Sequence, residues 1–544
     1  MHFIISSAAL SVPFALSSHY VFNRHEPRPL HFILIALGFV FLAPIVLNPL
    51  YQDTSIPYSL IQSFVCLSIY LTTLSSSMIA YRLSPWHPLS QYPGPKLAAI
   101  TKWWMIYFIL FRGGRHRILQ ELHSKYGDSV RVGPNELSIN TAAAVNPIYL
   151  NLHRASYYRG VPTSSDTLIT ITDRKEHTQR RRAWNKSLSR TEMPKFALMA
   201  NTRIEQLLGI FSGGVASKAV DLHQWMSLLL MDMIGDMAFS GGFETMKAGK
   251  DIDGWMHMLD IGAAIVAVLG QIPWSREIAA LLPQKGPIET FHSFANKKIE
   301  ESTTRQLTYG IKSDILSVIL NDHHDGGYRL SDDEAAADAS LLIASSLETT
   351  SQAITTIFRH LAADKIVLAR LQAELDEVVG AEVDELDYAT LEKLQYLDAC
   401  VQESLRIIPP APAGPPRTTG EKGAIILERY VPPNTTVYVP TWALQRDADN
   451  FRDPEAFIPE RWLPGSTISP HNTDAFIPFS AGFGACVGKQ LALQNIKLVV
   501  AHIVRRFSVE FPNGFSAIRF DDSYKERSLW VHDPLLVKLT PREI

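Results

Sequence analysis

The chain has 544 residues, of which 51 are basic and 54 acidic, so its formal net charge is −3. This balance argues against a nucleic-acid-binding protein, which would carry a basic surface. Hydrophobic residues make up 46% of the chain, which excludes a disordered protein and is enough to build a large core. The three cysteines exclude a disulfide framework and a four-cysteine zinc site.

The first 81 residues have the composition of a membrane region. Apolar stretches cover about residues 3–22, 31–50 and 58–81, and each is long enough for a helix that crosses a ~30 Å hydrocarbon core. We therefore expect residues 1–81 to contain two or three transmembrane helices. The first stretch is the weakest, because it contains Pro13 and several serines. The alternative for this stretch is a cleaved signal peptide, although it lacks a basic n-region.

Basic residues around these stretches predict the orientation in the membrane. The loop after the first stretch carries Arg24 and Arg28, whereas the loop after the second carries no basic residue. Arg82, Lys96 and Lys102 follow the third stretch. The positive-inside rule therefore places the first loop, and everything after residue 81, on the cytosolic side.

From residue 82 the sequence changes character. Residues 82–95 are rich in proline and predict a stiff linker, and residues 96–544 contain no internal repeat, so we interpret them as one large domain. Residues 116–126 have helical spacing and end before Gly127, a common helix stop. The sequence SVRVGPNELSI that follows predicts two short strands around a Gly-Pro turn.

Helices dominate the rest of the predicted domain. Ser331 and Glu334 form a capping box, with acidic residues in the first turn, and predict the start of an unusually long helix. After the two strands in SVRVGPNELSI, further short strands are expected at AIIL and TTVYVP, late in the chain. The fold class is therefore mainly α with small β-sheets. The expected helices cover much of residues 174–320, and then about 331–363, 364–379, 390–408 and 488–506.

A cysteine in a glycine-rich segment is the strongest candidate for chemistry. In FSAGFGACVG, Cys486 is flanked by Gly482, Gly484 and Gly488, which allow the backbone to bend sharply and to approach a flat ligand. A helix is expected to start directly afterwards, so its first N–H groups would stabilise a thiolate that could bind a metal. The alternative is a buried structural cysteine, and this segment alone does not decide between the two.

Charged residues in apolar surroundings mark two further sites. Glu403 and Arg406 lie on one face of a predicted helix, where they can pair, and Arg461 follows in a proline-bounded turn. The alternative is a solvated pair of little energetic value. In the long helix, SSLETT (345–350) places Glu348 in a mostly apolar segment, where burial without a role is costly. Its alternative is a polar stripe that faces water.

Together and in this order, these motifs resemble the cytochrome P450 superfamily of haem-thiolate monooxygenases, in particular its fungal membrane-bound members. The FxxGxxxCxG pattern is matched at Phe479, Gly482, Cys486 and Gly488. The ExxR pair, the PERW turn, the SSLETT helix and the YPGPK segment occur in the order and at the spacing of the family. The resemblance covers about residues 90–540 and implies the cytochrome P450 fold.

The resemblance implies roles for residues near the expected haem iron. Cys486 corresponds to the thiolate ligand of the iron, in a haem that is iron protoporphyrin IX (haem b). Glu348 and Thr349 correspond to the acid–alcohol pair that helps to deliver protons to bound oxygen. Relatives usually carry Ala or Gly and then Gly before the acid, whereas this chain has Ser345 and Ser346. These serines add hydroxyl groups beside the oxygen site.

The resemblance also implies how the haem propionates are held. His177, Arg181 and Arg417 correspond to propionate-binding residues of the family. Relatives usually carry a further arginine two residues before the cysteine, where this chain has Gly484. We therefore expect the three residues to bind the propionates alone, or the haem to be held more loosely.

The family also has a structural Glu–Arg–Arg triad that fixes the chain near the haem. Glu403, Arg406 and Arg461 match it.

The function implied by the resemblance is a membrane-bound monooxygenase, expected in the endoplasmic reticulum with its catalytic domain facing the cytosol. It would use O2 and electrons from an NADPH-dependent reductase to oxidise a lipophilic small molecule, such as a terpenoid of secondary metabolism. Pocket residues are expected at about 155–172 and 255–275.

Two other functions stay open at this point. The first is a reductase-independent isomerase or dehydratase, although such relatives often lack the acid–alcohol pair. The second is a membrane transporter or receptor built on the three apolar stretches. Against it, no further apolar span follows in the rest of the chain.

Overall fold

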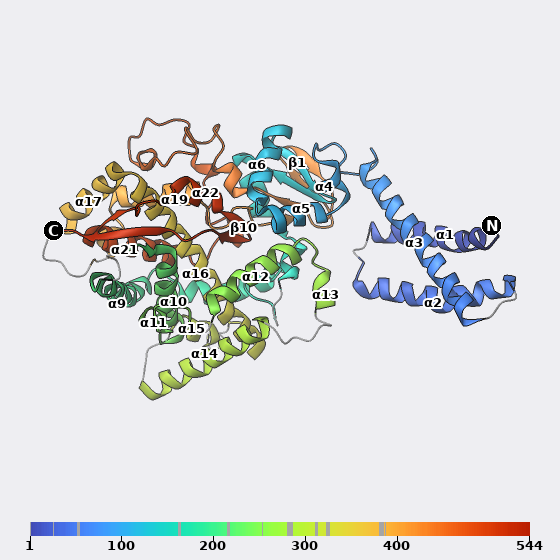
Figure 1. Ribbon diagram of the computed structural model, residues 1–544, viewed down its shortest axis with the longest axis horizontal. Coiled ribbons are helices and arrows are strands. Elements are labelled where there is room, and N and C mark those ends of the chain that lie inside the picture. The colour runs from blue at the N-terminus through green and yellow to red at the C-terminus, as the bar shows by residue number, and fades with distance from the viewer. Residues whose placement is uncertain are drawn as a thin grey trace.

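A computed structural model shows three N-terminal helices set apart from a larger, mainly helical body (Figure 1). The structure describes residues 2–543 except 25–26, 52–54, 162–164, 215–217, 253, 280–286, 310–313, 322–326, 380–385 and 387. Short strands form small sheets in the body. The predicted fold class, mainly α with small sheets, is confirmed.

The N-terminal helices coincide with the three predicted apolar stretches. They are α1 (His2–Phe22), α2 (Pro29–Tyr51) and α3 (Ile56–Leu83). Of the described helices, α2 and α3 are long and apolar enough to cross a membrane, whereas α1 falls short of that criterion. A buried cluster that includes Ala15, Phe39 and Tyr70 nevertheless packs the three helices together.

The proline-rich segment after α3 is fixed to the body. Its Leu89 and Tyr92 are buried in a cluster of the body. The Arg82 guanidinium donates to the carbonyl of Ile100 at 2.6 Å, and Arg131 donates to the carbonyl of Arg82 at 3.0 Å. These contacts set the direction in which the chain leaves α3.

A five-stranded sheet contains the predicted hairpin and brings distant segments together. Its order is β1-β2-β8-β5-β3, and β2 and β8 are the only parallel neighbours within this sheet. Arg154 of β3 lies directly opposite Arg417 of β5. The strands are β1 (Ser129–Gly133), β2 (Glu136–Ile139), β3 (His153–Arg154), β5 (Arg417–Thr418) and β8 (Thr436–Tyr438).

The other described strands form two- and three-stranded sheets. The AIIL segment becomes β6 of a two-stranded sheet and the TTVYVP segment becomes β8 of the five-stranded sheet, as predicted. The remaining strands are β4 (Val220–Asp221), β6 (Ala424–Ile426), β7 (Arg429–Val431), β9 (Phe507–Glu510), β10 (Lys525–Arg527), β11 (Leu529–Val531) and β12 (Leu536–Pro541).

The predicted long helix is α16 (Asp332–Ala363), and it lies in the middle of the body (Figure 1). The capping box is present, because Ser331 accepts from the N–H of Glu334 while the Glu334 side chain accepts from the N–H of Ser331. The helix packs against α10 (Leu222–Phe239), α14 (Pro287–Tyr309) and α21 (Lys489–Arg506). The buried faces of α16 therefore form part of the centre of the helical body.

The helix predicted over 390–408 is wrong in its first turn. The structure has the short α18 (Tyr388–Leu391), a break, and then α19 (Gln395–Ile407). The carboxylate of Glu374 accepts the N–H groups of Tyr396 and Leu397 at 2.7 and 2.8 Å, and so caps α19 from another helix. Local sequence could not show this cap.

The other described helices cover the sheet and surround α16. They are α4 (Lys96–Ile100), α5 (Trp103–Tyr107), α6 (Arg115–Tyr126), α7 (Val145–Asn151), α8 (Arg174–Ser187), α9 (Met193–Ser212), α11 (Thr245–Ala248), α12 (Trp255–Leu269), α13 (Ser275–Ala279), α15 (Ile315–Asn321), α17 (Lys365–Val379), α20 (Thr441–Leu444) and α22 (Ala517–Ser523). Short helical turns lie at Phe108–Arg112, Ala142–Ala144, Ser156–Gly160, Pro459–Trp462, Thr473–Ala475 and Gly482–Gly484.

Candidate active site

A cavity of about 1920 Å³ runs from Cys486 to the adjoining ends of α1 and α2. Its wall is mainly apolar and includes the middle of α16, the loop before α21 and much of α12. Residues from both predicted pocket segments, 155–172 and 255–275, line it. Within the first segment, residues 162–164 lie outside the described part of the chain.

Cys486 stands on the cavity wall just before α21, and its side chain is exposed to the cavity. Its N–H donates to the carbonyl of Phe479 at 2.9 Å, which closes the glycine-rich loop. Gly482 in this loop has φ 67°, and a Cβ there would collide with the backbone of Tyr149, so the turn requires glycine.

The environment of the Cys486 sulfur has opposing effects on its ionisation. Burial raises the pKa of the thiol, whereas the N–H of Gly488 and the charges of Arg181 and Lys489 lower it. The predicted help from the backbone is thus present but weaker than the effect of burial. A metal ion bound to the sulfur would favour the thiolate further.

Four buried or half-buried cationic or basic side chains contact Phe483, three residues before the cysteine, and the exposed Arg174 lies over its ring at 5.1 Å. The guanidinium carbons of Arg154 and Arg417 lie 5.9 and 5.5 Å from the ring centroid. The ring of His177 meets Phe483 edge-on at 5.6 Å, and Arg181 donates to the Phe483 carbonyl at 3.2 Å. The structure therefore brings the three predicted residues together and adds Arg154, which the sequence analysis missed.

This cluster is positively charged and incompletely paired. Within the described part of the chain, none of its three arginines forms an ion pair with a carboxylate. Burial and the neighbouring arginines lower the pKa of His177 to about 3, so His177 is neutral. Among the described residues, His177 Nδ1 and Arg417 Nε are buried without a hydrogen-bond partner. Unpaired buried charge is costly, so the cluster fits an anionic group.

The middle of α16 lines the cavity with one carboxyl group and several hydroxyl groups. Burial, and to a lesser degree the charge of Asp260, raises the pKa of Glu348 to about 8. The hydroxyls of Ser345, Ser346 and Thr349 donate to carbonyls four residues earlier, at 2.6, 2.7 and 2.7 Å. Each hydroxyl oxygen still has lone pairs that accept a hydrogen bond from the cavity. Both serines lie on the cavity wall.

Glu403, Arg406 and Arg461 form a fully buried network, which removes the alternative of a solvated pair. Both carboxylate oxygens of Glu403 accept from Arg406, at 2.8 and 2.9 Å, and Arg461 Nε donates to one of them at 3.1 Å. The N–H of Ile458 and the indole of Trp462 also donate, each at 2.9 Å. Burial raises the pKa of Glu403, but the two arginines outweigh it and hold the pKa below its usual value.

The family model of cytochrome P450 matches residues 95–533. The chain belongs to the cytochrome P450 family. Cytochrome P450 67 of Uromyces fabae is 30% identical to it, over 97% of this chain and 98% of its own length. Tryprostatin B 6-hydroxylase of Aspergillus fumigatus is 32% identical over 88% and 85%, and cytochrome P450 monooxygenase AMT3 of Alternaria alternata is 30% identical over 84% and 94%.

Membership of the cytochrome P450 family confirms the predicted enzyme class and rules out the transporter or receptor. It implies a haem iron, and the residues present fit that group. Cys486 offers a thiolate to the iron, and the Phe483 cluster offers unpaired donors to anionic propionates. Gly484 leaves a space that Arg417 enters, since a Cβ at Gly484 would collide with the Arg417 guanidinium.

Proposed function

We propose that this cytochrome P450 binds haem b through Cys486 and inserts an oxygen atom from O2 into a lipophilic small molecule. The position of Cys486 on the wall of a mainly apolar cavity is the observation that supports this most. Bound haem supplies the activation of dioxygen, which the electron-rich thiolate favours. The protein's own side chains bind and orient the haem and donate protons into the cavity.

His177, Arg181 and Arg417 are proposed to bind the propionates. Among the described residues, the buried Nε–H of Arg417 has no hydrogen-bond partner. The Arg181 guanidinium lowers the pKa of Cys486, and the Cys486 thiolate raises the pKa of Arg181. Neutral His177 accepts from Arg154 at Nε2, so its proton is on Nδ1 and is available to an acceptor. These donors come from α8 and β5, two elements that are far apart in the sequence.

Glu348 and Thr349 are proposed to move protons to the cavity. Because its pKa is about 8, the Glu348 carboxyl holds a proton at neutral pH. The Thr349 hydroxyl, and next to it that of Ser345, can accept hydrogen bonds on the cavity wall. Retention of the acid–alcohol pair disfavours the alternative isomerase or dehydratase, which needs no such proton path.

Glu348→Gln should divert electrons from product to hydrogen peroxide. Loss of a positioned proton donor typically costs 10²–10⁴-fold, so we expect product formation to fall by roughly 10²-fold or more. The fraction of NADPH recovered as peroxide, measured with purified enzyme and reductase, checks this. In the unmodified enzyme, coupling should also fall as the pH rises through about 8, where Glu348 loses its proton, and the variant should lack this dependence.

Thr349→Ser and Thr349→Val make a matched pair for the same path. The serine variant keeps the hydroxyl and should stay coupled, whereas the valine variant should release peroxide. Equal coupling in the two variants, together with an unchanged pH profile in Glu348→Gln, would contradict the proposed proton path.

Two measurements test the function as a whole. A carbon monoxide difference spectrum of the reduced protein should show the band of thiolate-ligated haem. Product formation should require NADPH and the reductase, whereas an isomerase or dehydratase would turn over without them.

The name of one relative specifies the 6-hydroxylation of tryprostatin B, and we propose a secondary metabolite, such as a terpenoid, as substrate. Metabolite profiles of a deletion strain would identify it.

The N-terminal helices are proposed to anchor the enzyme in the endoplasmic reticulum, with the catalytic domain in the cytosol. In sealed microsomes, a C-terminal tag on the full chain should be digested by added protease while a lumenal marker stays intact. If all three helices span, an N-terminal tag should be protected. A protected C-terminal tag would reverse the assigned orientation.

A further inference from the structure

A polar patch on the cavity wall has no role in the proposed haem binding or proton path. It comprises Lys102, Glu136, Gln271, Thr436 and Tyr438, all of which line the same cavity as Cys486. These residues come from the segment before α5, from β2, from the segment after α12 and from β8. Polar side chains that are distant in the sequence thus meet on a mainly apolar wall.

The pairing of β2 with β8 places one side of the polar patch. Glu136 lies opposite Thr436, and Tyr438 follows two residues later, so the three side chains share one face of the sheet. Arg417 of the neighbouring strand pairs with Val437 and therefore points to the other face. The polar patch and Arg417 thus lie on opposite faces of the sheet.

Lys102 reaches across the polar patch and is held there by the protein. Its ammonium contacts the carboxylate of Glu136 and donates to Oε1 of Gln271 at 3.0 Å. Gly133 leaves room for this arrangement, since a Cβ there would lie 2.9 Å from Cβ of Glu136 and 3.3 Å from Cδ of Lys102. An ammonium has three N–H groups, so one of them remains for a further acceptor.

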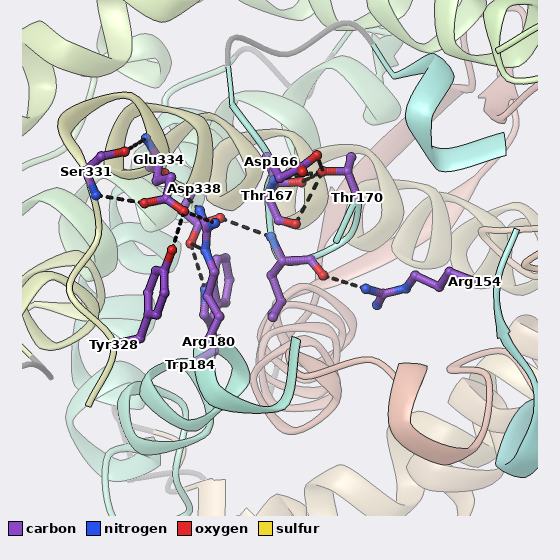
Figure 2. Close-up of polar contacts among 11 residues, drawn as sticks. Arg154, Asp166, Thr167, Thr170, Arg180, Trp184, Tyr328, Ser331, Glu334 and Asp338 are labelled. Carbon is purple, nitrogen blue, oxygen red and sulfur yellow. Dashed lines mark hydrogen bonds and ion pairs between the residues drawn. The ribbon is translucent and has the colours of Figure 1, made fainter. Parts of the chain in front are cut away.

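The hydroxyl groups of the polar patch are not paired within the protein. Those of Thr436 and Tyr438 have no hydrogen-bond partner in the part of the chain that the structure describes. Thr167, elsewhere on the same wall, differs: its hydroxyl donates to Thr170 at 3.4 Å, and the Thr170 hydroxyl donates to Asp166 at 3.1 Å (Figure 2). The polar patch therefore offers donors to a molecule in the cavity, whereas Thr167 is already engaged.

The charges around the polar patch are balanced, and this decides the kind of group that it can bind. Lys102 is paired with Glu136, and Arg115 on the same wall donates to both oxygens of Glu526, at 2.7 and 2.5 Å. A carboxylate would add an unbalanced buried charge beside Glu136, whereas an uncharged oxygen atom would not. Even beside Glu136, burial and the charge of Arg115 lower the pKa of Lys102 to about 7, so a further acceptor would stabilise the ammonium form.

We infer that the polar patch binds an uncharged oxygen atom of the substrate, such as that of a ketone, lactone, amide or alcohol, through Lys102, Thr436 and Tyr438. The inference rests on the proposed haem-thiolate function. It narrows the substrate from any lipophilic small molecule to one that carries such an oxygen. The apolar part of the substrate then lies along the rest of the wall, toward Cys486.

Imidazoles with an alkyl chain test the polar patch in the full-length holoenzyme, because the imidazole binds haem iron and changes the visible spectrum. Three probes differ only at the far end of the chain, which carries a methyl group, a methyl ketone or a carboxylate, and each is made in several chain lengths. A hydrogen bond from a charged donor changes affinity by roughly 10-fold or more. At the best length, the ketone should therefore bind roughly 10-fold more tightly than the alkyl probe, and the carboxylate no more tightly than the ketone.

Two substitutions remove donors and keep most of the side-chain volume. In Lys102→Met the ketone should lose most of its advantage, and in Tyr438→Phe part of it, while the alkyl probe binds as in the unmodified enzyme. Lys102→Met combined with Glu136→Gln avoids an unpaired carboxylate and should show the same loss. The control is Lys298→Met, because Lys298 is also a half-buried lysine, is paired with Glu301 and does not line the described cavity.

A structural role would weaken the binding of all probes alike, because a disturbed cavity does not distinguish a ketone from a methyl group. Equal losses for the ketone and alkyl probes in Lys102→Met, or equal affinities of the two probes at every length in the unmodified enzyme, would overturn the inference. A carboxylate that bound more tightly than the ketone would also overturn it, since the polar patch would then be an anion site. If no probe changed the spectrum of the unmodified enzyme, the proposed haem-thiolate function itself would fail.

Discussion

Cys486→Ala is expected to abolish the carbon monoxide band of thiolate-ligated haem and all reductase-dependent oxidation. Cys486 is the only cysteine on the wall of the described cavity, because Cys66 and Cys400 are buried in other clusters. No second thiolate can therefore replace it. Haem content and the difference spectrum, measured on protein purified from the same expression host, check the result.

Cys400→Ala is the matched control for this substitution. Burial raises the pKa of Cys400 well above its usual value, so its thiol stays protonated and packs as a small apolar group. We expect a normal spectrum from this variant. A pigmented, active Cys486→Ala protein would contradict the assignment of the iron ligand, and with it the role proposed for the whole cavity.

Features of the fold that depend on residues close together in the sequence could be predicted. The capping box at Ser331, the apolar stretches of the first 81 residues and the Gly-Pro hairpin each carry their signal within a few positions. The break before α19 could not be predicted, because Glu374 supplies its cap from another helix. The same limit explains why sequence could not reveal Arg154, whose partner Arg417 is brought opposite it only by the sheet.

The three consecutive arginines at 180–182 show which site residues the sequence could predict and which it could not. In a helix, successive side chains point about 100° apart, so Arg180, Arg181 and Arg182 cannot share one role. Arg180 is buried against Asp338, Arg181 reaches the Phe483 carbonyl, and Arg182 is exposed. The family motif selected Arg181 for a propionate, which stays a prediction, and Arg181 is the member whose charge interacts with Cys486. It could not show that Arg180 pairs with an acid of α16, 158 positions away.

Glu403→Ala should give little folded, haem-containing protein. The substitution leaves Arg406 and Arg461 buried without the carboxylate that both contact, and removal of one member of a buried ion pair costs about 3–5 kcal/mol. Typical proteins have a free energy of unfolding of about 5–15 kcal/mol, so this loss is a large share. The ratio of carbon monoxide band to total polypeptide, compared with the unmodified enzyme, measures the effect.

The pH dependence of stability tests the same network from the other side. Because Glu403 has a lower pKa in the folded protein than in the unfolded chain, its contribution is complete above the usual glutamate range and is lost as the pH falls through the folded value. Glu403→Gln should flatten that acid limb. The control is Glu392→Ala, whose exposed pair with Arg190 contributes about 0–1 kcal/mol. Normal haem incorporation in Glu403→Ala would show that Arg406 and Arg461 do not depend on this carboxylate, and the network would then not be what holds the segment around Trp462 against α19.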